Sequence, residues 1–377
     1  MTSPAPCLTD LVWCTPHPVH YNTFLFERLA QIEGIRLTVV YFDRQLAAYP
    51  WKTVSTSLVA PVYLRRWCKV DWRFFFERLT HRRELMVIAG WNEPTMLMLL
   101  VTFAALGRPY VIWSDTPNPR PRTGAKAWLR RHVLDLVLRN ACRFLVTGQP
   151  GIDAVRALGL PPERIVNFPF ATDTTVFHPA SARDVEPGII TCISSGRLDN
   201  SHKAYDVAIE AFSRVKARNP QLRFRYVIAG DGPDRDAIKA LIRQHGLSDD
   251  VVLRGWLESN ELPEFYRSAD VLIHSSNFDP FPNAVLEAMA SGLPVVGSRA
   301  AGSVQDRVVD GYNGFVHAPG DAKELGDVLT RFLLMPIESR RQLGIHARQT
   351  ALQWHVDYHA NAIRKLVSEF TSLQHGN

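Results

Sequence analysis

The sequence lacks the cysteine pattern of a disulfide framework or a zinc site, because its five cysteines are scattered and include no C-x-x-C spacing. It also has no apolar run of the roughly 18 residues that a membrane-spanning helix needs. The best candidate, PTMLMLLVTFAAL at 94–106, is shorter and is predicted to be a buried helix with Pro94 in its first turn. The first residues, MTSPAPCLTDLVW, lack the basic segment and apolar core of a secretory signal. These absences favour a cytoplasmic protein in a reducing compartment.

Disorder and coiled coils are excluded for most of the chain, since 46% hydrophobic and 21% charged residues are normal for a globular protein. A length of 377 residues suits two domains of about 150–200 residues each. The net charge of +6 is uneven, being +8 over residues 1–178 and −2 over residues 179–377. A basic half can attract nucleic acid, an anionic membrane or an acidic substrate, and charge alone does not choose among them.

Short β-branched or aromatic runs alternate with longer helical patterns along the chain. Strands are predicted at 8–14, 35–42, 85–89, 109–113, 142–147, 189–194, 224–229, 251–254, 271–274 and 294–297, with helices between them, for example at 204–217, 235–244, 283–291 and 322–334. This alternation predicts an α/β fold with two doubly wound parallel sheets in Rossmann-like domains. The predicted domains are 1–178 and 179–345, joined near 177–188, where Pro, Ala, Ser and charge are frequent. Ligands of such sheets bind in a cleft at the carboxyl ends of the strands.

The densest chemical signal is the segment HSSNFDPFPNAVLEAMASGLPVVGSRAAG at 274–302. A strand ends at its start, a loop carries Asp279, and a helix begins near Asn283, carries Glu287 and ends at Gly292. The N-terminus of such a helix presents N–H groups that favour a negative or hydroxyl-rich ligand. Acids at this edge of a sheet commonly bind sugar hydroxyls. An isolated pair of acids would favour a solvated loop residue and an ordinary helix residue, but the surrounding pattern favours the sugar-binding role.

This segment resembles glycosyltransferase family 4, whose members have the GT-B fold of two Rossmann-like domains facing a cleft. The family motif is E-x7-E followed by A-x-G-x-P-V-V, and Asp279-x7-Glu287 with ASGLPVV at 290–296 matches it, with Asp in place of the first Glu. The resemblance implies that Glu287 holds the nucleotide ribose and that Asp279 contacts the donor sugar. It also implies that backbone N–H groups assist Asp279, in the stretch formed by Phe281, Pro282 and Asn283.

Three further segments match the family in the same order. SGRLDNSHKAYD at 195–206 resembles the segment whose Arg and Lys grip the donor diphosphate, which implies this role for Arg197 and Lys203. Two cations after a strand can stabilise a departing diphosphate, and solvated surface charge is the alternative. Ala204 stands where the family has Gly. The turns AGDGP at 229–233 and RGW at 254–256 are also similar, so the implied donor contacts include Gly196, Gly230, Gly232, Gly255 and Trp256, although Trp256 would equally suit the core.

The first half carries weaker signals at the same edge of its own sheet. CTPHPVHYNTFLFERLA at 14–30 places four acceptor-side candidates after the first strand, namely His17, His20, Tyr21 and Asn22. The family's Gly-Gly loop, which meets the donor phosphates, is absent here. Either the side chain of His20 or Asn22 takes its place, or the loop serves the acceptor, or the histidine is structural. Asp115 follows Ser114 where the family often has His-Asp, and it is a further acceptor-side candidate. The resemblance also implies that residues 346–377 form a helix packing back across the domains.

Residues 63–85 mix seven Lys or Arg residues with six aromatic residues. One interpretation is an amphipathic helix whose basic positions face solvent. The other is a surface that associates peripherally with an anionic membrane and so reaches a lipid-linked acceptor. Nucleic-acid binding is disfavoured, because no known nucleic-acid module accompanies the charge.

The sequence therefore predicts a retaining glycosyltransferase that moves a sugar from a UDP-, GDP- or ADP-sugar to a glycan or lipid-linked acceptor, in cell-envelope polysaccharide or glycolipid assembly. No D-x-D motif occurs within 195–206 or 274–302, so a metal-independent reaction with no further cofactor is expected, carried by orientation and by the two cations. The expected location is the cytoplasm or the inner face of the membrane. The alternatives are a sugar-nucleotide epimerase or phosphorylase on the same fold, and a degenerate subunit that binds nucleotide-sugar without turning it over.

Overall fold

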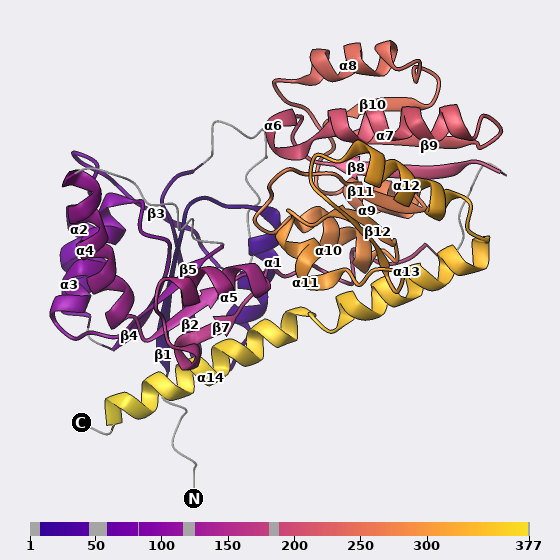
Figure 1. Ribbon diagram of the computed structural model, residues 1–377. Coiled ribbons are helices and arrows are strands. Elements are labelled where there is room, and N and C mark those ends of the chain that lie inside the picture. Colours follow the sequence, from indigo (N-terminus) through magenta and orange to yellow (C-terminus); the bar gives the residue numbers. More distant parts are fainter. Residues whose placement is uncertain (1–7, 45–58, 82, 116–124, 181–187, 376–377) are drawn as a thin grey trace, which may run out of the picture. The chain divides into compact units, whose positions relative to one another are not determined.

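The computed structural model describes residues 8–44, 59–81, 83–115, 125–180 and 188–375. The chain divides into two compact units: unit 1 contains Met1–Ala171 and Val356–Asn377, and unit 2 contains Thr172–His355. Each unit has one sheet with helices on both faces, and the pairings between its strands are parallel (Figure 1). The predicted α/β class with two Rossmann-like domains is confirmed.

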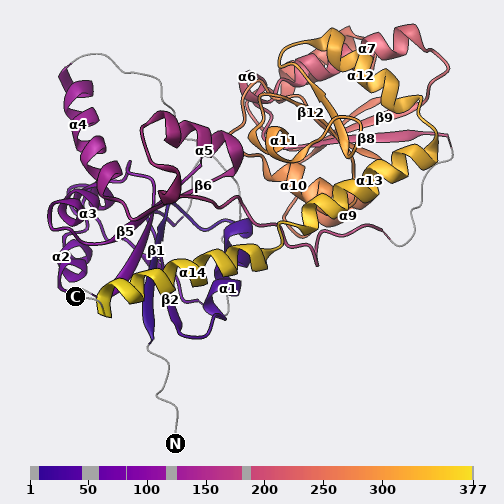
Figure 2. The ribbon, with the colours of Figure 1, turned by 60° about the horizontal axis from the view of Figure 1, so that its bottom comes forward.

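Unit 1 is built on a seven-stranded sheet in the order β3-β2-β1-β4-β5-β6-β7. Its elements are β1 (Thr9–Thr15), α1 (His20–Ala30), β2 (Ile35–Tyr41), β3 (Val62–Tyr63), α2 (Trp72–Thr80), β4 (Glu84–Ala89), α3 (Pro94–Ala105), β5 (Tyr110–Ser114), α4 (Ala125–Asn140), β6 (Arg143–Val146), α5 (Gly148–Ala157), a 3-10 turn at Pro162–Arg164, β7 (Ile165–Asn167) and α14 (Val356–His375). Apolar side chains of α1 and α14 cover one face of this sheet, and α14 lies beside α1 (Figure 2). Side chains of α2, α3, α4 and α5 cover the other face.

Unit 2 is built on a six-stranded sheet in the order β10-β9-β8-β11-β12-β13. Its elements are β8 (Ile190–Ser195), α6 (Asn200–Lys203), α7 (Tyr205–Arg218), β9 (Phe224–Ala229), α8 (Arg235–Gln244), β10 (Val251–Gly255), α9 (Leu262–Arg267), β11 (Val271–His274), α10 (Asn283–Ala290), β12 (Val295–Ser298), α11 (Gly302–Arg307), β13 (Gly314–His317), α12 (Ala322–Leu333) and α13 (Ile337–Leu352). Helices α7, α8 and α12 pack on one face of the sheet, and α9, α10 and α11 pack on the other.

The predicted strands differ from the observed ones by at most one residue at either end. Three strands were not predicted: β3 and β7, which have two and three residues, and β13, which follows the turn DGYN. Strands this short show no alternation of apolar and polar residues, so their pairing depends on neighbours that the local sequence does not reveal.

The basic and aromatic stretch at 63–85 is not one helix, because only Trp72–Thr80 is helical. A tight turn precedes this helix, closed by hydrogen bonds from Trp67 N to Val70 O at 2.8 Å and from Val70 N to Trp67 O at 3.2 Å. Asp71 then caps α2 by accepting a hydrogen bond from Phe74 N at 2.9 Å. The turn and the cap together determine where the helix begins.

The apolar segment at 94–106 forms α3, which begins with Pro94 and buries Met96, Leu99, Leu100 and Phe103 against the sheet. The predicted buried helix is therefore confirmed. None of the helices within the described ranges combines the length and the apolar character that crossing a membrane requires.

A glycine lets α13 approach the end of α10. A β-carbon at Gly344, in the middle of α13, would lie 2.4 Å from the carbonyl oxygen of Gly292, whereas one at Gly326 in α12 would lie no closer than 3.4 Å to Ala211 O. Alanine is the better helix former, so Gly326→Ala is expected to leave unfolding unchanged or to raise its free energy by up to about 1 kcal/mol. Gly344→Ala is expected to lower it by roughly 1–3 kcal/mol, because the helix must shift. Calorimetric unfolding of the two variants and wild type measures this difference, and equal stability of the variants would contradict the proposed close contact.

Candidate functional site

The candidate residues of unit 2 lie at the carboxyl edge of its sheet. Three loops meet there because parallel strands end at the same edge. The loop after β8 carries Gly196 and Arg197, the loop after β9 carries Gly230 and Gly232, and the loop after β11 carries Asp279. Residues far apart in the sequence are thereby brought to one edge.

The first two loops pack backbone against backbone. A β-carbon at Gly230 would lie 1.9 Å from the carbonyl oxygen of Gly196, and one at Gly232 would lie 2.5 Å from that of Leu198. Leu198 N donates to Asp231 O at 3.0 Å, which fixes the two loops together. Glycine is required at Gly230 and Gly232 by this contact between loops, whatever else the backbone approaches.

Lys203 is the last residue of α6 and forms an ion pair with the Asp279 carboxylate. It is followed by Ala204, a buried residue in the left-handed region with φ of +52°. The Ser275 hydroxyl lies 3.0 Å from Lys203 O and 2.9 Å from Ala204 O, so it holds this turn against the loop after β11. Arg197 lies half-buried in the loop after β8.

Asp279 is held as an anion by two neighbours. His274 Nε2, at the end of β11, lies 3.4 Å from Asp279 Oδ2 and 3.0 Å from the Ser276 hydroxyl. Burial alone would raise the pKa of Asp279, but the hydrogen bond with His274 and the charge of Lys203 outweigh it and lower the pKa to about 2. Burial lowers the pKa of His274 despite Asp279. Near neutral pH the site therefore contains a carboxylate next to an ammonium group.

Glu287 lies on the buried face of α10 and is held by a tyrosine. Tyr266 donates its hydroxyl hydrogen to Glu287 Oε2 at 2.9 Å, and the Ser195 hydroxyl lies 2.7 Å from the same tyrosine oxygen. All three groups are in unit 2, and Tyr266 is fully buried. Glu287 is thus joined through Tyr266 to the end of β8.

The N-terminus of α10 points its first N–H groups toward the same edge. Pro282 has no N–H, so within the predicted stretch only Phe281 and Asn283 can donate. Phe281 and Pro282 are buried, and Oδ1 of Asn283 is buried without a hydrogen-bond partner among the described residues. Gly302 allows α11 to pack here, since a β-carbon on it would lie 1.8 Å from Pro280 O.

Gly255 is the last residue of β10, and Trp256 follows it at the same edge. Gly255 O accepts a hydrogen bond from Gly230 N at 2.8 Å, and Gly255 has φ of +85°. Trp256 is half-buried, and its ring nitrogen is buried.

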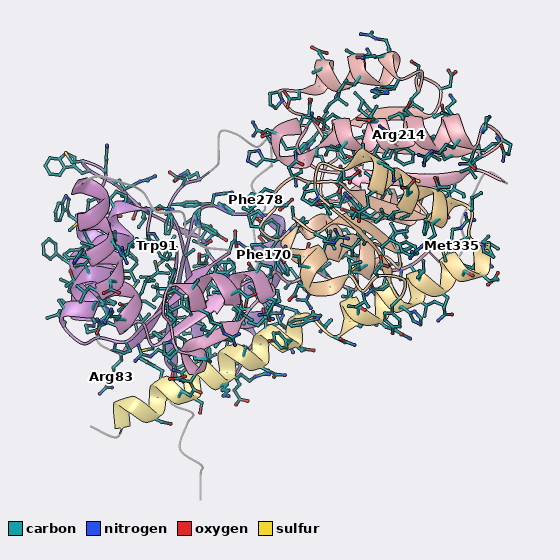
Figure 3. The ribbon with its side chains drawn as sticks, viewed as in Figure 1. Arg83, Trp91, Phe170, Arg214, Phe278 and Met335 are labelled. Atoms are coloured by element: carbon teal, nitrogen blue, oxygen red, sulfur yellow. The ribbon has the colours of Figure 1, made fainter. Side chains whose placement is uncertain are left out.

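The unit 1 candidates lie at the carboxyl edge of the other sheet. His17 follows β1 and is half-buried, and burial lowers its pKa against the opposing charge of Asp43. Tyr21 meets Phe170, which is labelled in Figure 3, edge to face with ring centroids 5.2 Å apart. Asn22 is buried. Asp115 is exposed after β5. His20 begins α1, and its side chain lies outside the described residues.

Sequence reasoning missed Tyr266 and gave no role to His274. Neither residue belongs to a recognisable spacing, because each meets its acid only when the sheet order is formed. Among the residues that the structure describes, no group of three His, Cys, Asp or Glu residues could hold a metal ion.

The comparison with protein families finds that residues 178–350 match the family described as glycosyl transferases group 1. Among curated proteins, mannosylfructose-phosphate synthase of Agrobacterium fabrum is 26% identical over 58% of this chain and 52% of its own length. The putative colanic acid biosynthesis glycosyltransferase WcaL of Salmonella typhimurium is 31% identical over 56% of this chain and 52% of its own length. The matched part of the chain thus spans about half the length of these relatives.

Among solved structures, Anabaena HepE in complex with UDP is similar with a TM-score of 0.71 and 17% sequence identity, over 96% of this chain and all of that one. At this identity the likeness concerns the fold alone. It confirms the predicted GT-B type of fold, and the family match covers the motif region at 195–302 on which the predicted resemblance mainly rests.

The lowered pKa of Asp279 makes part of the stability of unit 2 depend on pH. A carboxyl pKa of about 2, against 3.8 ordinarily, stabilises the folded state above about pH 4, and this contribution is lost as the pH falls toward 2. Lys203→Met removes one of the two groups that lower the pKa. It is expected to reduce the free energy of unfolding at pH 7 by about 1–2 kcal/mol and by much less at pH 2.5. Urea unfolding at both pH values tests this, with Lys239→Met on the exposed face of α8 as the control. An equal loss at both pH values would contradict the assignment.

Proposed function

Because residues 178–350 match the family of group 1 glycosyl transferases, we propose that this protein moves a sugar from a nucleotide-sugar donor to an acceptor hydroxyl. The observation that carries the proposal is the Lys203–Asp279 ion pair, at the same sheet edge as Glu287. A nucleotide-sugar presents a diphosphate, a ribose and a sugar ring. Cations suit the first of these, and carboxylates that accept hydrogen bonds from hydroxyl groups suit the other two.

In this proposal Glu287 binds the ribose. A carboxylate accepts several hydrogen bonds, so Glu287 can accept one from a ribose hydroxyl while Tyr266 keeps donating to it. The tyrosine restricts the carboxylate to one orientation before the donor arrives. Pre-orientation of this kind lowers the entropic cost of binding.

Arg197 and Lys203 bind the diphosphate. An ammonium group has three N–H donors, so Lys203 can contact a phosphate oxygen without releasing Asp279. The charge on the diphosphate grows as the sugar departs, and fixed cations stabilise the transition state more than the ground state. Two fixed cations can supply this stabilisation without a metal ion, so the proposed reaction is metal-independent and of the family 4 type.

Asp279 orients the donor sugar. With a pKa of about 2 it is an anion near neutral pH, so it accepts hydrogen bonds from sugar hydroxyls and does not serve as a general acid. Such a site offers positioning and charge stabilisation, which fits the proposed retention of anomeric configuration without a protein nucleophile.

The acceptor is proposed to bind at the edge of the unit 1 sheet, near His17, Tyr21, Asn22 and Asp115, with His20 as a further candidate. The name of the Salmonella relative supports an acceptor from cell-envelope polysaccharide. The basic charge of residues 1–178 supports a lipid-linked acceptor at the inner, cytoplasmic face of the membrane.

Donor binding and transfer test the proposal. Calorimetric titration with UDP-, GDP- and ADP-sugars is expected to reveal one donor that binds, with UDP-sugars tried first because HepE was crystallised with UDP. Glu287→Ala is expected to abolish this binding. Arg197→Ala and Lys203→Ala are expected to reduce transfer at least a hundredfold, since each removes a charge-assisted contact worth roughly 3 kcal/mol.

Other outcomes identify the alternatives. Turnover of donor without acceptor indicates an epimerase, and a pyridoxal chromophore indicates a phosphorylase. Binding without transfer or hydrolysis, unchanged by Asp279→Glu, indicates a degenerate subunit. Near wild-type transfer by both cation variants overturns the diphosphate assignment.

The role of Tyr266 is tested by a matched pair of tyrosines. Tyr226 has the same kind of contact, with its hydroxyl 2.7 Å from that of Ser194, and it packs in the core with α7. Among the described residues, no acid forms a hydrogen bond with the Tyr226 hydroxyl. Tyr266→Phe is expected to weaken donor binding about tenfold, because Glu287 loses the bond that orients it. Tyr226→Phe is expected to lower stability similarly while leaving donor affinity within about twofold. Equal affinities of the two variants would contradict a positioning role for Tyr266.

A further inference from the structure

Unit 1 exposes three large aromatic side chains close together in the sequence. Trp67 is 73% exposed, Trp72 40% and Phe76 59%. Trp72 and Phe76 lie one helical turn apart on α2, and their rings stack with centroids 6.3 Å apart. Phe74 and Phe75 of the same helix point inward to the core of unit 1. The helix therefore buries two aromatic side chains and leaves Trp72 and Phe76 exposed. We call Trp67, Trp72 and Phe76 the aromatic surface.

Three exposed cations are interleaved with the aromatic surface: Arg65, Lys69 and Arg73. None of them forms an ion pair with another residue in the described part of the chain. The acids nearby are already engaged, because Glu77 pairs with Arg78 and Asp43 pairs with Arg66, while Asp71 is buried as the cap of α2. The surface is therefore basic as well as apolar.

The backbone that presents this surface is held firmly. The buried Asp71 carboxylate accepts hydrogen bonds from Phe74 N at 2.9 Å and from Arg65 N at 2.6 Å, so it joins α2 to the segment before the turn. Arg66 donates to Phe42 O at 3.0 Å and anchors the same segment to the end of β2.

The turn itself is strained. Cys68 and Lys69 have φ of +51° and +70°, values that two-residue hairpin turns usually assign to Asn and Gly. Two consecutive non-glycine residues in this region cost free energy, and such strain persists where the surrounding structure over-determines it. Here it places Trp67, Cys68 and Lys69 at an exposed tip.

We propose that the aromatic surface and its three cations dock unit 1 onto an anionic lipid membrane. Tryptophan is favoured at the boundary between headgroups and acyl chains, where one end of the ring is apolar and the other is wet. Each nearby Lys or Arg is attracted by the negative potential of anionic lipids. A flat lipid surface can bind these residues without a groove on unit 1 and without acids placed to match each cation. A protein partner of comparable affinity would have to supply such matching features. Membrane docking requires neither donor nor acceptor, so it goes beyond the proposed transfer reaction.

The test is flotation of the full-length protein with vesicles of phosphatidylcholine alone or mixed with phosphatidylglycerol. Wild type is expected to bind the mixed vesicles, and high salt is expected to weaken this binding. The variant Trp67→Ser/Trp72→Ser/Phe76→Ser is expected to bind at least tenfold more weakly. Arg65→Gln/Lys69→Gln/Arg73→Gln is expected to lose about a hundredfold and with it the preference for anionic vesicles.

Matched controls remove comparable groups elsewhere. Ile345→Ser takes an exposed apolar side chain from α13, and Lys239→Gln/Arg243→Gln takes two exposed cations from α8. Both controls are expected to bind vesicles like wild type, and all variants are expected to retain the wild-type unfolding temperature and donor affinity.

A probe at the tip gives a second readout. Cys68 is the exposed one of the four described cysteines, so an environment-sensitive fluorophore attached there in a Cys7→Ser background is expected to shift to shorter wavelength on mixed vesicles. Absence of vesicle binding by wild type, or unchanged binding by both surface variants, overturns the proposal. A dimer that becomes monomeric in the aromatic variant and never binds lipid also overturns it and assigns the surface to self-association. None of these outcomes bears on donor binding, which separates a failure here from a failure of the proposed function.

Discussion

The carboxylates of Asp279 and Glu287 are both largely removed from water, and an ionised carboxylate in such surroundings loses solvation that the protein must replace. In unit 2, side chains from different helices and strands replace the lost solvation. Asp279 receives Lys203 from α6 and His274 from β11, and Glu287 receives Tyr266 from α9. The sheet order that brings these elements to one edge therefore also brings each of the two acids its hydrogen-bonding or charged partners.

This constraint extends into the backbone. The loops after β8 and β9 approach so closely that no β-carbon fits at Gly230 or Gly232, and α11 approaches Pro280 across Gly302. The charged side chains of the site consequently lie on loops that contact one another through main-chain atoms. A site built this way has few flexible parts, which suits chemistry that depends on orientation and fixed charge.

Much of this arrangement can be predicted from the sequence. Strand and helix bounds follow from local patterns, and the motif at 274–302 places Asp279 before α10 and Glu287 on it, as the structure shows. The GT-B type of fold predicted from those same residues is confirmed, and residues 178–350 match the family of group 1 glycosyl transferases. The contacts that support the acids were not predictable. Tyr266 and Glu287 are 21 positions apart, and their bond exists only because α9 and α10 pack on the same face of the sheet. The short strands β3, β7 and β13 escaped prediction for the same reason, since pairing rather than pattern defines them.

In unit 1 the candidate residues lie at the carboxyl edge of the sheet, where fewer contacts between them are described than in unit 2. His17, Tyr21 and Asn22 follow β1 as expected. Tyr21 contacts Phe170, which follows β7. The basic and aromatic stretch shows how a turn changes an interpretation. Once Cys68 and Lys69 adopt left-handed backbone, the stretch cannot be a single helix, and its aromatic residues divide between the core and the surface.

Ala204 limits how this sequence can vary during evolution. A buried position in the left-handed region excludes β-branched and bulky side chains on backbone grounds, and burial excludes polar ones that lack a partner. Glycine and alanine are therefore nearly the only amino acids that position 204 tolerates. Lys203 precedes Ala204, and the Ser275 hydroxyl binds the carbonyl oxygens of both residues. A substitution of Ala204 would therefore also displace the ammonium group of Lys203. Lineages that alter position 204 are therefore expected to alter the loop after β11 with it, so the two segments should co-vary as a pair.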